Sequence, residues 1–377
     1  MPPAEHMIAL NIPGRKKVRN NGIMAFLLAT TLTTTALAQQ IPEDRPTFDE
    51  NGTVNVPAFR LPPSQLSSEE AREAQAMRGR IPVGEMTSNE NPDINTRRVQ
   101  LDRMMSPRVE QMKALYPVDI EETKMGGVRV RIITPKDGDF DQDRVLINLH
   151  GGAFTVCWDS CSLVESLPIS SLGKYKVVSV DYRMAPENRH PAGVEDAAAV
   201  YRDLLNNYKA ERIGVYGCSA GGALTAQLAA WLPTKGLPQM GAAGIFGAGG
   251  VRFQSGDSAY VTAKIDGSFP GPAEDGSLAM DMTRGYFDGS DLDAPILSPA
   301  LHADVMKTFP PTLITTGTRA MDMSLAIYTN SQLLKADVES TLIVGEAMGH
   351  CYQYNPALPE SRDAYAATVK HFRKHLD

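Results

Sequence analysis

The chain has 377 residues, of which 42% are hydrophobic and 21% are charged, and its formal net charge at pH 7 is −7. This composition is typical of a globular protein, and the length suffices for one catalytic domain with additional segments. The negative balance argues against a polyanionic partner, and the sequence contains no nucleic-acid-binding motif.

Residues 1–38 are predicted to be a cleavable secretory signal. A basic stretch at residues 15–19 precedes an apolar stretch that begins at residues 23–29, and Ala36-Leu37-Ala38 has the small-x-small pattern of a cleavage site. The apolar stretch is diluted by threonines and too short for a stable membrane anchor, although an unprocessed N-terminal tether is the alternative. Because the signal looks bacterial, we expect a periplasmic or extracellular protein.

The rest of the chain is expected to form an N-terminal cap or arm segment at residues 39–115 and a catalytic domain at residues 116–377. A helix is predicted across residues 68–77, opened by Ser68 as its cap. Apolar runs predict strands at residues 145–149, 176–180, 212–216, 311–316 and 340–344, and residues 194–205 have the pattern of an amphipathic helix. This alternation predicts an α/β fold with a mostly parallel sheet covered by helices on both faces.

A His-Gly-Gly run, His150 to Gly152, directly follows the predicted strand at residues 145–149. Glycines after a strand let the main chain turn its N–H groups inward, where they can stabilise the negative oxygen of a tetrahedral intermediate. We therefore predict that Gly151 and Gly152, together with Ala220, supply an oxyanion hole. The alternative is that these glycines only form a tight turn.

The segment from Gly217 to Gly222 contains Gly-x-Ser-x-Gly between a predicted strand and a helical pattern. In this context the motif predicts a nucleophile elbow, in which the turn is so sharp that the serine is strained and larger residues would collide at the flanking glycines. Ser219 is therefore the predicted nucleophile, placed at a helix N-terminus that favours an oxyanion.

Three blocks in this order resemble the hormone-sensitive lipase family of α/β-hydrolase esterases: residues 150–154, residues 180–187 (Val-Asp-Tyr-Arg-Met-Ala-Pro-Glu) and residues 217–222. The resemblance implies an α/β-hydrolase fold with a helical cap, built here from the N-terminal segment and an insertion at about residues 251–293. It also implies that Asp181, Arg183 and Glu187 brace the loops under the site. Two positions depart from the family pattern, with Ala153 as the third residue of the glycine run and Cys218 before the nucleophile.

The order of the triad in this fold places a histidine after the last strand, and His350 follows the predicted strand at residues 340–344. The family pattern would place the acid at position 320, where this chain has Ala320. Asp322 is the nearest carboxylate and the predicted acid, with Glu346 as a more distant candidate. In the alternative, Asp322 only caps the following helix and no orienting acid exists.

The four cysteines form two pairs with different expectations. Cys157 and Cys161 are close enough in sequence for a local disulfide if their loop is not helical, and they lack the further ligands of a metal site. Cys218 and Cys351 adjoin Ser219 and His350 in sequence, and both are predicted to be buried packing residues rather than nucleophiles.

The predicted protein is a serine carboxylesterase that hydrolyses short-chain acyl esters through an acyl-enzyme, with no cofactor and no metal. Its partner is a small-molecule ester, and a homodimer is possible. A lactonase or deacetylase of the same fold is the first alternative. A binding protein on an impaired hydrolase scaffold is the second, because of Ala320. Aromatic residues of the insertion either wall an acyl pocket or pack the cap: Phe253, Tyr260, Phe269, Tyr286 and Phe287.

Overall fold

The computed structural model describes residues 45–78, 93–266, 269, 271–273, 275–277 and 281–376, so the predicted signal at residues 1–38 lies outside the described residues. The chain divides into two compact units, Met1–Arg60 and Leu61–Asp377. In the described part of the first unit, β1 (Thr47–Phe48) and β2 (Val54–Asn55) form an antiparallel hairpin. Everything that bears on the functional site belongs to the second unit.

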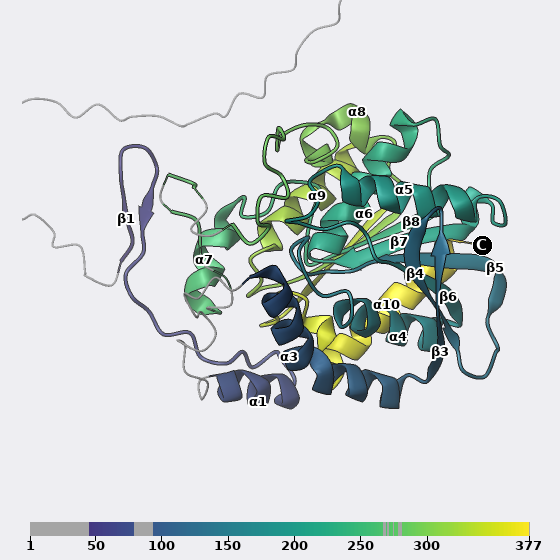
Figure 1. Ribbon diagram of the computed structural model, residues 1–377. Helices are drawn as coiled ribbons and strands as arrows, with labels where there is room; N and C mark the ends of the chain where they lie inside the picture. Colours follow the sequence, from purple (N-terminus) through teal and green to yellow (C-terminus); the bar gives the residue numbers. More distant parts are fainter. Residues whose placement is uncertain are drawn as a thin grey trace, which may run out of the picture. The chain divides into compact units, whose positions relative to one another are not determined.

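The second unit is built around an eight-stranded sheet with the order β10-β9-β8-β7-β5-β6-β4-β3 (Figure 1). The six strands from β10 to β6 in this order pair in parallel, whereas β4 pairs antiparallel with both β6 and β3. The strands are β3 (Val118–Met125), β4 (Val128–Pro135), β5 (Asp141–Leu149), β6 (Tyr175–Val180), β7 (Ile213–Cys218), β8 (Ala242–Phe246), β9 (Thr312–Gly317) and β10 (Ser340–Gly345).

Helices cover both faces of this sheet, α5, α6 and α9 on one side and α4 and α10 on the other (Figure 1). Successive side chains of a strand point to opposite faces, so Ile147 of β5 packs with the first group and Leu146 with the second. The helices are α1 (Glu69–Arg78), α3 (Ile94–Leu115), α4 (Cys161–Gly173), α5 (Ala192–Leu204), α6 (Ala220–Thr234), α7 (Asp257–Ile265), α8 (Ala303–Met306), α9 (Met323–Lys335) and α10 (Pro359–His375).

The predicted α/β-hydrolase fold, with its mostly parallel sheet, is confirmed. The five apolar runs form β5, β6, β7, β9 and β10, with ends that move by one to a few residues. The predicted N-terminal helix is α1, and its cap is Ser68, whose hydroxyl accepts the N–H of Ala71 at 3.1 Å. Among the described helices, none is long and apolar enough to cross a membrane.

Candidate active site

Ser219 lies at the sharp turn between β7 and α6, with φ 58° and ψ −123°. This left-handed conformation is strained for a residue with a side chain. The glycines on either side are required by space, because a Cβ at Gly217 or Gly221 would overlap the carbonyl oxygen of Leu149 on β5. The predicted elbow geometry is therefore present, and its cause is the close approach of the β5 end to the turn.

His350 lies in the loop after β10, and its Nδ1 is 2.5 Å from Oδ1 of Asp322. The other oxygen of Asp322 accepts the hydroxyl of Thr316 on β9 at 2.5 Å, and the carboxylate is fully buried. Because Nδ1–H donates to the carboxylate, Nε2 is the ring nitrogen that remains as a proton acceptor. Asp322 thus takes the orienting place for which position 320 offers only Ala320.

Neither alternative for the triad acid, a purely capping Asp322 or Glu346, is supported by a contact in the described residues. Asp322 does stand at the first boundary of α9, but its side chain makes no capping hydrogen bond. No hydrogen bond between described residues joins Glu346 to His350. The two-residue displacement from position 320 is accommodated by the turn between β9 and α9.

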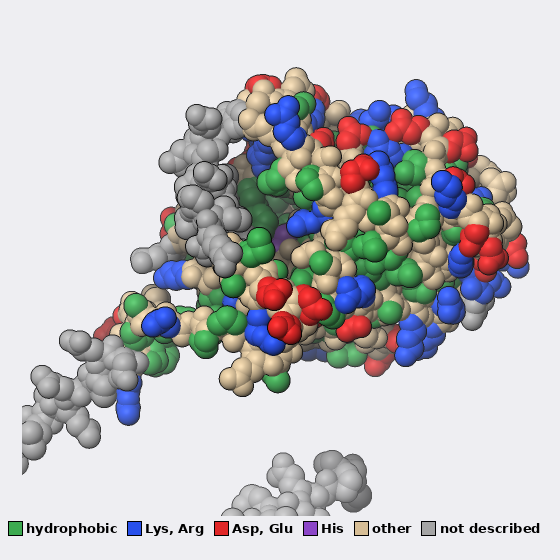
Figure 2. Space-filling view, turned by 90° about the horizontal axis from the view of Figure 1, so that it is seen from below, with side chains coloured by type: hydrophobic (Ala, Val, Ile, Leu, Met, Phe, Trp, Pro, Cys, Tyr) green, Lys and Arg blue, Asp and Glu red, His purple; other side chains and the backbone are tan. Residues whose placement is uncertain are grey.

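Ser219 and His350 line one cavity of about 730 Å³, whose wall is mainly apolar. Figure 2 shows this side of the molecule hollowed, with hydrophobic side chains in the wall and a histidine visible inside. Of the five aromatic residues predicted for the insertion, Phe253, Phe269 and Phe287 line the cavity. Tyr286 is instead buried, stacked on Phe154 with ring centroids 4.7 Å apart.

The predicted donor set for an oxyanion needs one correction, at Gly151. Its N–H donates to Oε1 of Glu165 at 2.8 Å, and the residue does not line the cavity. Gly152, with φ 116°, and Ala153, with φ 53°, both line the cavity beside Ala220. Of residues 151–153, the two that line the cavity are therefore Gly152 and Ala153.

Glu165 of α4 contacts several segments of the site, and the motifs did not reveal it. Its carboxylate accepts hydrogen bonds from Gly151 N–H at 2.8 Å, Asn148 Nδ2 at 2.8 Å and Cys218 N–H at 3.2 Å. The Tyr354 hydroxyl is the fourth donor. This one side chain is therefore bonded to the His-Gly-Gly loop, to the residue before Ser219, and to the short helix (Tyr352–Tyr354) that follows His350.

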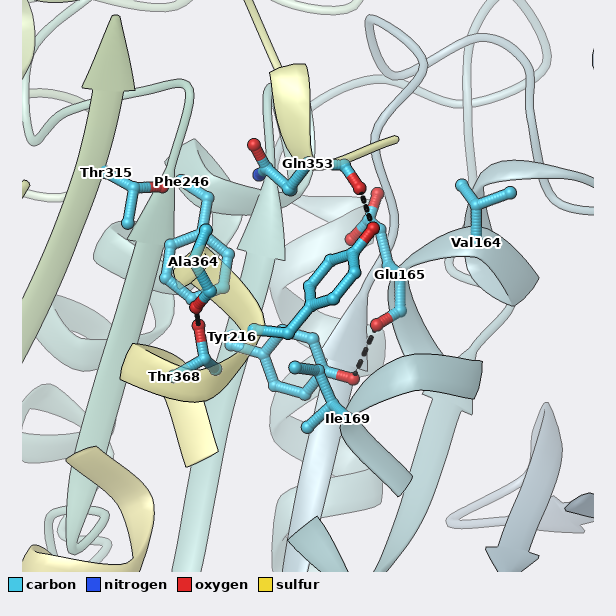
Figure 3. Close-up of a pocket in the computed structure, with 10 residues that line it drawn as sticks. Val164, Glu165, Ile169, Tyr216, Phe246, Thr315, Gln353, Ala364 and Thr368 are labelled. Atoms are coloured by element: carbon cyan, nitrogen blue, oxygen red, sulfur yellow. Dashed lines mark hydrogen bonds between the residues drawn. The ribbon is translucent and has the colours of Figure 1, made fainter. Parts of the chain in front are cut away.

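Glu165 is buried, and burial raises its pKa to about 7 although all four hydrogen bonds favour the charged form. Figure 3 shows Glu165 beside Tyr216, whose hydroxyl donates to the main-chain oxygen of Glu165 at 3.2 Å. The signal that sequence reasoning missed is a single acidic residue within the otherwise uncharged stretch 161–173 that forms α4.

His150 supports the same loop from its other side. Its ring stacks on Tyr182, with centroids 4.5 Å apart, and the Tyr182 hydroxyl donates to the main-chain oxygen of His150 at 2.7 Å. Burial lowers the pKa of His150 to about 4, so the imidazole is neutral at pH 7. The loop is thus held between Tyr182 and Glu165.

The structure corrects the prediction for Cys218 and Cys351, which form a disulfide across a sequence separation of 133. Their Cα atoms are 6.3 Å apart. The bridge joins the residue before Ser219 to the residue after His350. Two cysteines that each adjoin a catalytic candidate were a signal for this pairing, because the two candidates were expected to meet.

Cys157 and Cys161 also form a disulfide, with Cα atoms 5.0 Å apart. The bond is possible because α4 begins only at Cys161, so Cys157 lies in the preceding turn. Both cysteines line the cavity. Among the residues that the structure describes, no group of three or more His, Cys, Asp or Glu side chains could hold a metal ion.

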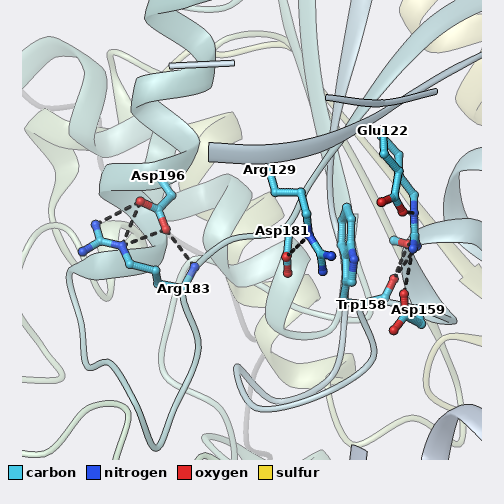
Figure 4. Close-up of polar contacts among 9 residues, drawn as sticks. Glu122, Arg129, Trp158, Asp159, Asp181, Arg183 and Asp196 are labelled. Carbon is cyan, nitrogen blue, oxygen red and sulfur yellow. Dashed lines mark hydrogen bonds and ion pairs between the residues drawn. The ribbon is translucent and has the colours of Figure 1, made fainter. Parts of the chain in front are cut away.

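The three polar residues of the block 180–187 each have an ionic partner. Figure 4 shows Asp181 paired with Arg129 and Arg183 paired with Asp196. Glu187 pairs with Arg98 of α3 at 2.7 Å. The Arg98 guanidinium also donates to the main-chain oxygen of Thr155, so the block connects α3 to the loop beside the cavity.

Comparison with known proteins shows the family of the chain. A profile of the family described as "alpha/beta hydrolase fold" matches residues 146–354. The chain is 30% identical over 229 residues to an acetyl-hydrolase of Streptomyces hygroscopicus, covering 59% of this chain and 72% of that protein. A versiconal hemiacetal acetate esterase of Emericella nidulans is 29% identical over 199 residues, covering 50% of this chain and 67% of that protein.

Solved structures of esterases are similar over most of the chain. An esterase called E25 superposes with a TM-score of 0.76 and 26% identity, covering 87% of this chain and all (100%) of that one. An esterase from the bacterial hormone-sensitive lipase family gives a TM-score of 0.69 and 26% identity, covering 83% of this chain and 100% of that one. The chain therefore belongs to the α/β-hydrolase fold family, among its hormone-sensitive lipase esterases, and is a carboxylic ester hydrolase.

Proposed function

We propose that this hydrolase is a serine esterase that cleaves short-chain acyl esters through an acyl-enzyme intermediate. The observation that carries the proposal is the contact between Asp322 and His350 at the wall of the cavity that also contains Ser219. A serine hydroxyl is a weak nucleophile without an adjacent base, and an oriented imidazole is the base that this arrangement offers.

In the proposed reaction, the Ser219 hydroxyl oxygen attacks the ester carbonyl carbon while Nε2 of His350 takes the hydroxyl proton. Asp322 holds the imidazole by Nδ1–H and stabilises its charged form. The N–H groups of Gly152, Ala153 and Ala220 bind the oxyanion of the tetrahedral intermediate. His350 then gives the proton to the leaving alcohol, and water, activated by the same imidazole, releases the acid from Ser219.

The short acyl group is supported by the names of two relatives, an acetyl-hydrolase and an acetate esterase. The cavity of about 730 Å³ greatly exceeds the size of an acetyl group. We therefore assign most of its volume to the alcohol part of the ester. A catalytically impaired binding protein is the less favoured function, because its only motivation was the alanine at position 320, and Asp322 supplies a carboxylate to His350.

The test is the release of p-nitrophenol from p-nitrophenyl acetate by the wild type and by Ser219→Ala. We expect turnover by the wild type, a loss of more than a thousandfold in the variant, and labelling of Ser219 alone by a fluorophosphonate probe. Unchanged turnover in Ser219→Ala, or labelling of another residue, would refute the serine mechanism.

We also propose that the protein is exported. The signal pattern at residues 1–38 supports export, and so do two disulfides, which persist in oxidising compartments. N-terminal sequencing of the mature protein from its native host should give a start near Gln39. A protein that retains residues 1–38 in the cytosolic fraction would contradict this proposal.

A further inference from the structure

The helix α3 presents two arginines to the catalytic cavity, at the ends of an apolar stretch. Arg97, Leu101, Met104 and Arg108 all line the cavity, and their spacing of four, three and four residues places them on one face of the helix. Met105, beside Met104, also lines the cavity and is buried in the core. The α3 face is therefore an apolar wall that carries a guanidinium at each end.

Neither guanidinium has a carboxylate partner among the described residues. Arg108 contacts the sulfur of Met105 at 3.8 Å, and its other polar neighbours are the hydroxyls of Tyr354 and Tyr365. The charged neighbour of Arg97 is Arg284, which has the same sign. By contrast, Arg98 on the adjacent face of the helix forms a 2.7 Å ion pair with Glu187.

Both arginines are half-buried, and burial lowers the pKa of each because a desolvated charge without a counter-ion is unfavourable. The acidic residues of the cavity wall do not pair with the two guanidinium groups. Asp281 accepts the N–H groups of Thr283 at 2.9 Å and Gly285 at 2.7 Å. The other acid in the wall, Asp288, lies 3.8 Å from Arg189.

We propose that the cavity selects esters that carry a carboxylate, which binds the Arg108 guanidinium while the apolar body of the substrate lies along Leu101 and Met104. A guanidinium forms two parallel hydrogen bonds with a carboxylate. Among the described residues, no carboxylate pairs with Arg108 in this way. Arg97 adds positive potential at the other end of the same wall. This inference rests on the proposed function, because it requires that the ester carbonyl be bound at Ser219.

The first experiment compares kcat/KM for charged and neutral esters of the same shape. One pair is mono-4-nitrophenyl glutarate and its methyl ester, with the charge on the acyl part. The other pair is 4-acetoxybenzoate and its methyl ester, with the charge on the alcohol part. We expect the wild type to prefer the anion in at least one pair, and 0.5 M NaCl to reduce that preference.

The variant is Arg108→Met, which keeps the apolar stem and removes the charge. It should lower the anion-to-neutral ratio of kcat/KM by about tenfold or more. The matched control is Arg103→Met, since Arg103 is exposed on α3 and does not line the cavity. A wild-type ratio near one in both pairs, or equal ratios in Arg108→Met and the wild type, would overturn the inference.

A second measurement separates this inference from the proposed function. Calorimetry with Ser219→Ala measures binding of each intact ester without turnover. Tighter binding of the anion, lost on adding Arg108→Met, would support the inference even if the wild type hydrolysed none of the four esters. Equal binding of charged and neutral esters would refute it even if p-nitrophenyl acetate were turned over.

Discussion

Replacing Glu165 with glutamine is the most informative perturbation of the site, because it keeps the shape of the side chain and removes half of its acceptors. The carboxylate is bonded to four donors, Gly151 N–H and the Tyr354 hydroxyl on one oxygen, and Asn148 Nδ2 and Cys218 N–H on the other. A glutamine presents one oxygen and one NH₂ group, so two of the four donor groups must then face the NH₂ group, which is itself a donor.

The less costly orientation of the glutamine can be worked out from these partners. With its NH₂ group toward Asn148 and Cys218, the main-chain N–H of Cys218 loses its acceptor, and the Asn148 amide and the Ser179 hydroxyl must also turn over. With its NH₂ group toward Gly151 and Tyr354, the tyrosine hydroxyl can turn to accept, and only Gly151 N–H is unsatisfied. One buried unsatisfied N–H costs about 1–3 kcal/mol. If the loop at residues 150–152 shifts and the transition state is destabilised by this amount, kcat falls roughly 5- to 150-fold.

The assay is the steady-state hydrolysis of p-nitrophenyl acetate by Glu165→Gln, with thermal unfolding as the check that the variant folds. We expect kcat to fall and KM to change little, because the loop holds the oxyanion more than the ground-state ester. The matched control is Tyr216→Phe, which removes a buried hydroxyl bonded to the main chain of Glu165 rather than to its carboxylate. A folded Glu165→Gln with kcat within twofold of the wild type would refute this reasoning.

The pH dependence gives a second readout of Glu165. Its pKa is raised to about 7, so the wild type should lose an ionised carboxylate as the pH falls from 8 to 6. When the carboxyl is protonated, only the Tyr354 hydroxyl can accept its proton, and the bonds to the loops must adjust. Protonation of the base His350 also lowers kcat, so the wild type should show one proton-dependent step near pH 7 in addition to that of His350, and Glu165→Gln should lose this additional step. The same number of steps in both proteins would assign the titration to another group.

Three further outcomes follow from the geometry. Asp322→Asn should reduce kcat by up to about ten-thousand-fold, because an amide favours the wrong tautomer of His350; a loss below tenfold with p-nitrophenyl acetate would exclude Asp322 as the acid. Removing the Cys218–Cys351 bridge by a double alanine variant should lower the free energy of unfolding in urea by about 3–5 kcal/mol, given a separation of 133 residues; an unchanged value would contradict this. Burial lowers the pKa of His371 to about 4, so the folded state binds a proton there less readily than the unfolded chain does. The free energy of unfolding should therefore fall as the pH drops from 6.5 to 4, and His371→Asn should reduce that fall. An equal fall in the variant and the wild type would contradict the prediction.

Five of the eight strands of the sheet were predictable, because they depend on local patterns. Apolar runs bounded by turns gave β5, β6, β7, β9 and β10, and Gly-x-Ser-x-Gly at a strand end specified the elbow. The strands β3, β4 and β8 were not predicted: β3 is mostly exposed and rich in charged residues, β4 carries two arginines among its apolar residues, and β8 is a short buried run of small and apolar residues. The exposed pattern of β3 resembles that of a surface segment.

The triad acid could be predicted from the family pattern only in part. The sequence excluded position 320 and offered Asp322 or Glu346, but the choice depended on the course of the turn between β9 and α9. In the fold, the Thr316 hydroxyl reaches Asp322 from β9, and the Nδ1–H of His350 reaches it from the loop after β10. Side-chain direction within a turn is not encoded in residue spacing, so only the structure could decide.

By itself, the sequence determined the α/β fold, the place of Ser219 at a strand-to-helix turn, and the candidate status of His350, because each follows from short segments. Only the tertiary structure decided that Gly151 N–H faces Glu165 and that Cys218 bonds to Cys351. These contacts join residues that are 14 and 133 positions apart. Their formation depends on how the sheet brings strand ends together, and on which buried donors then need an acceptor.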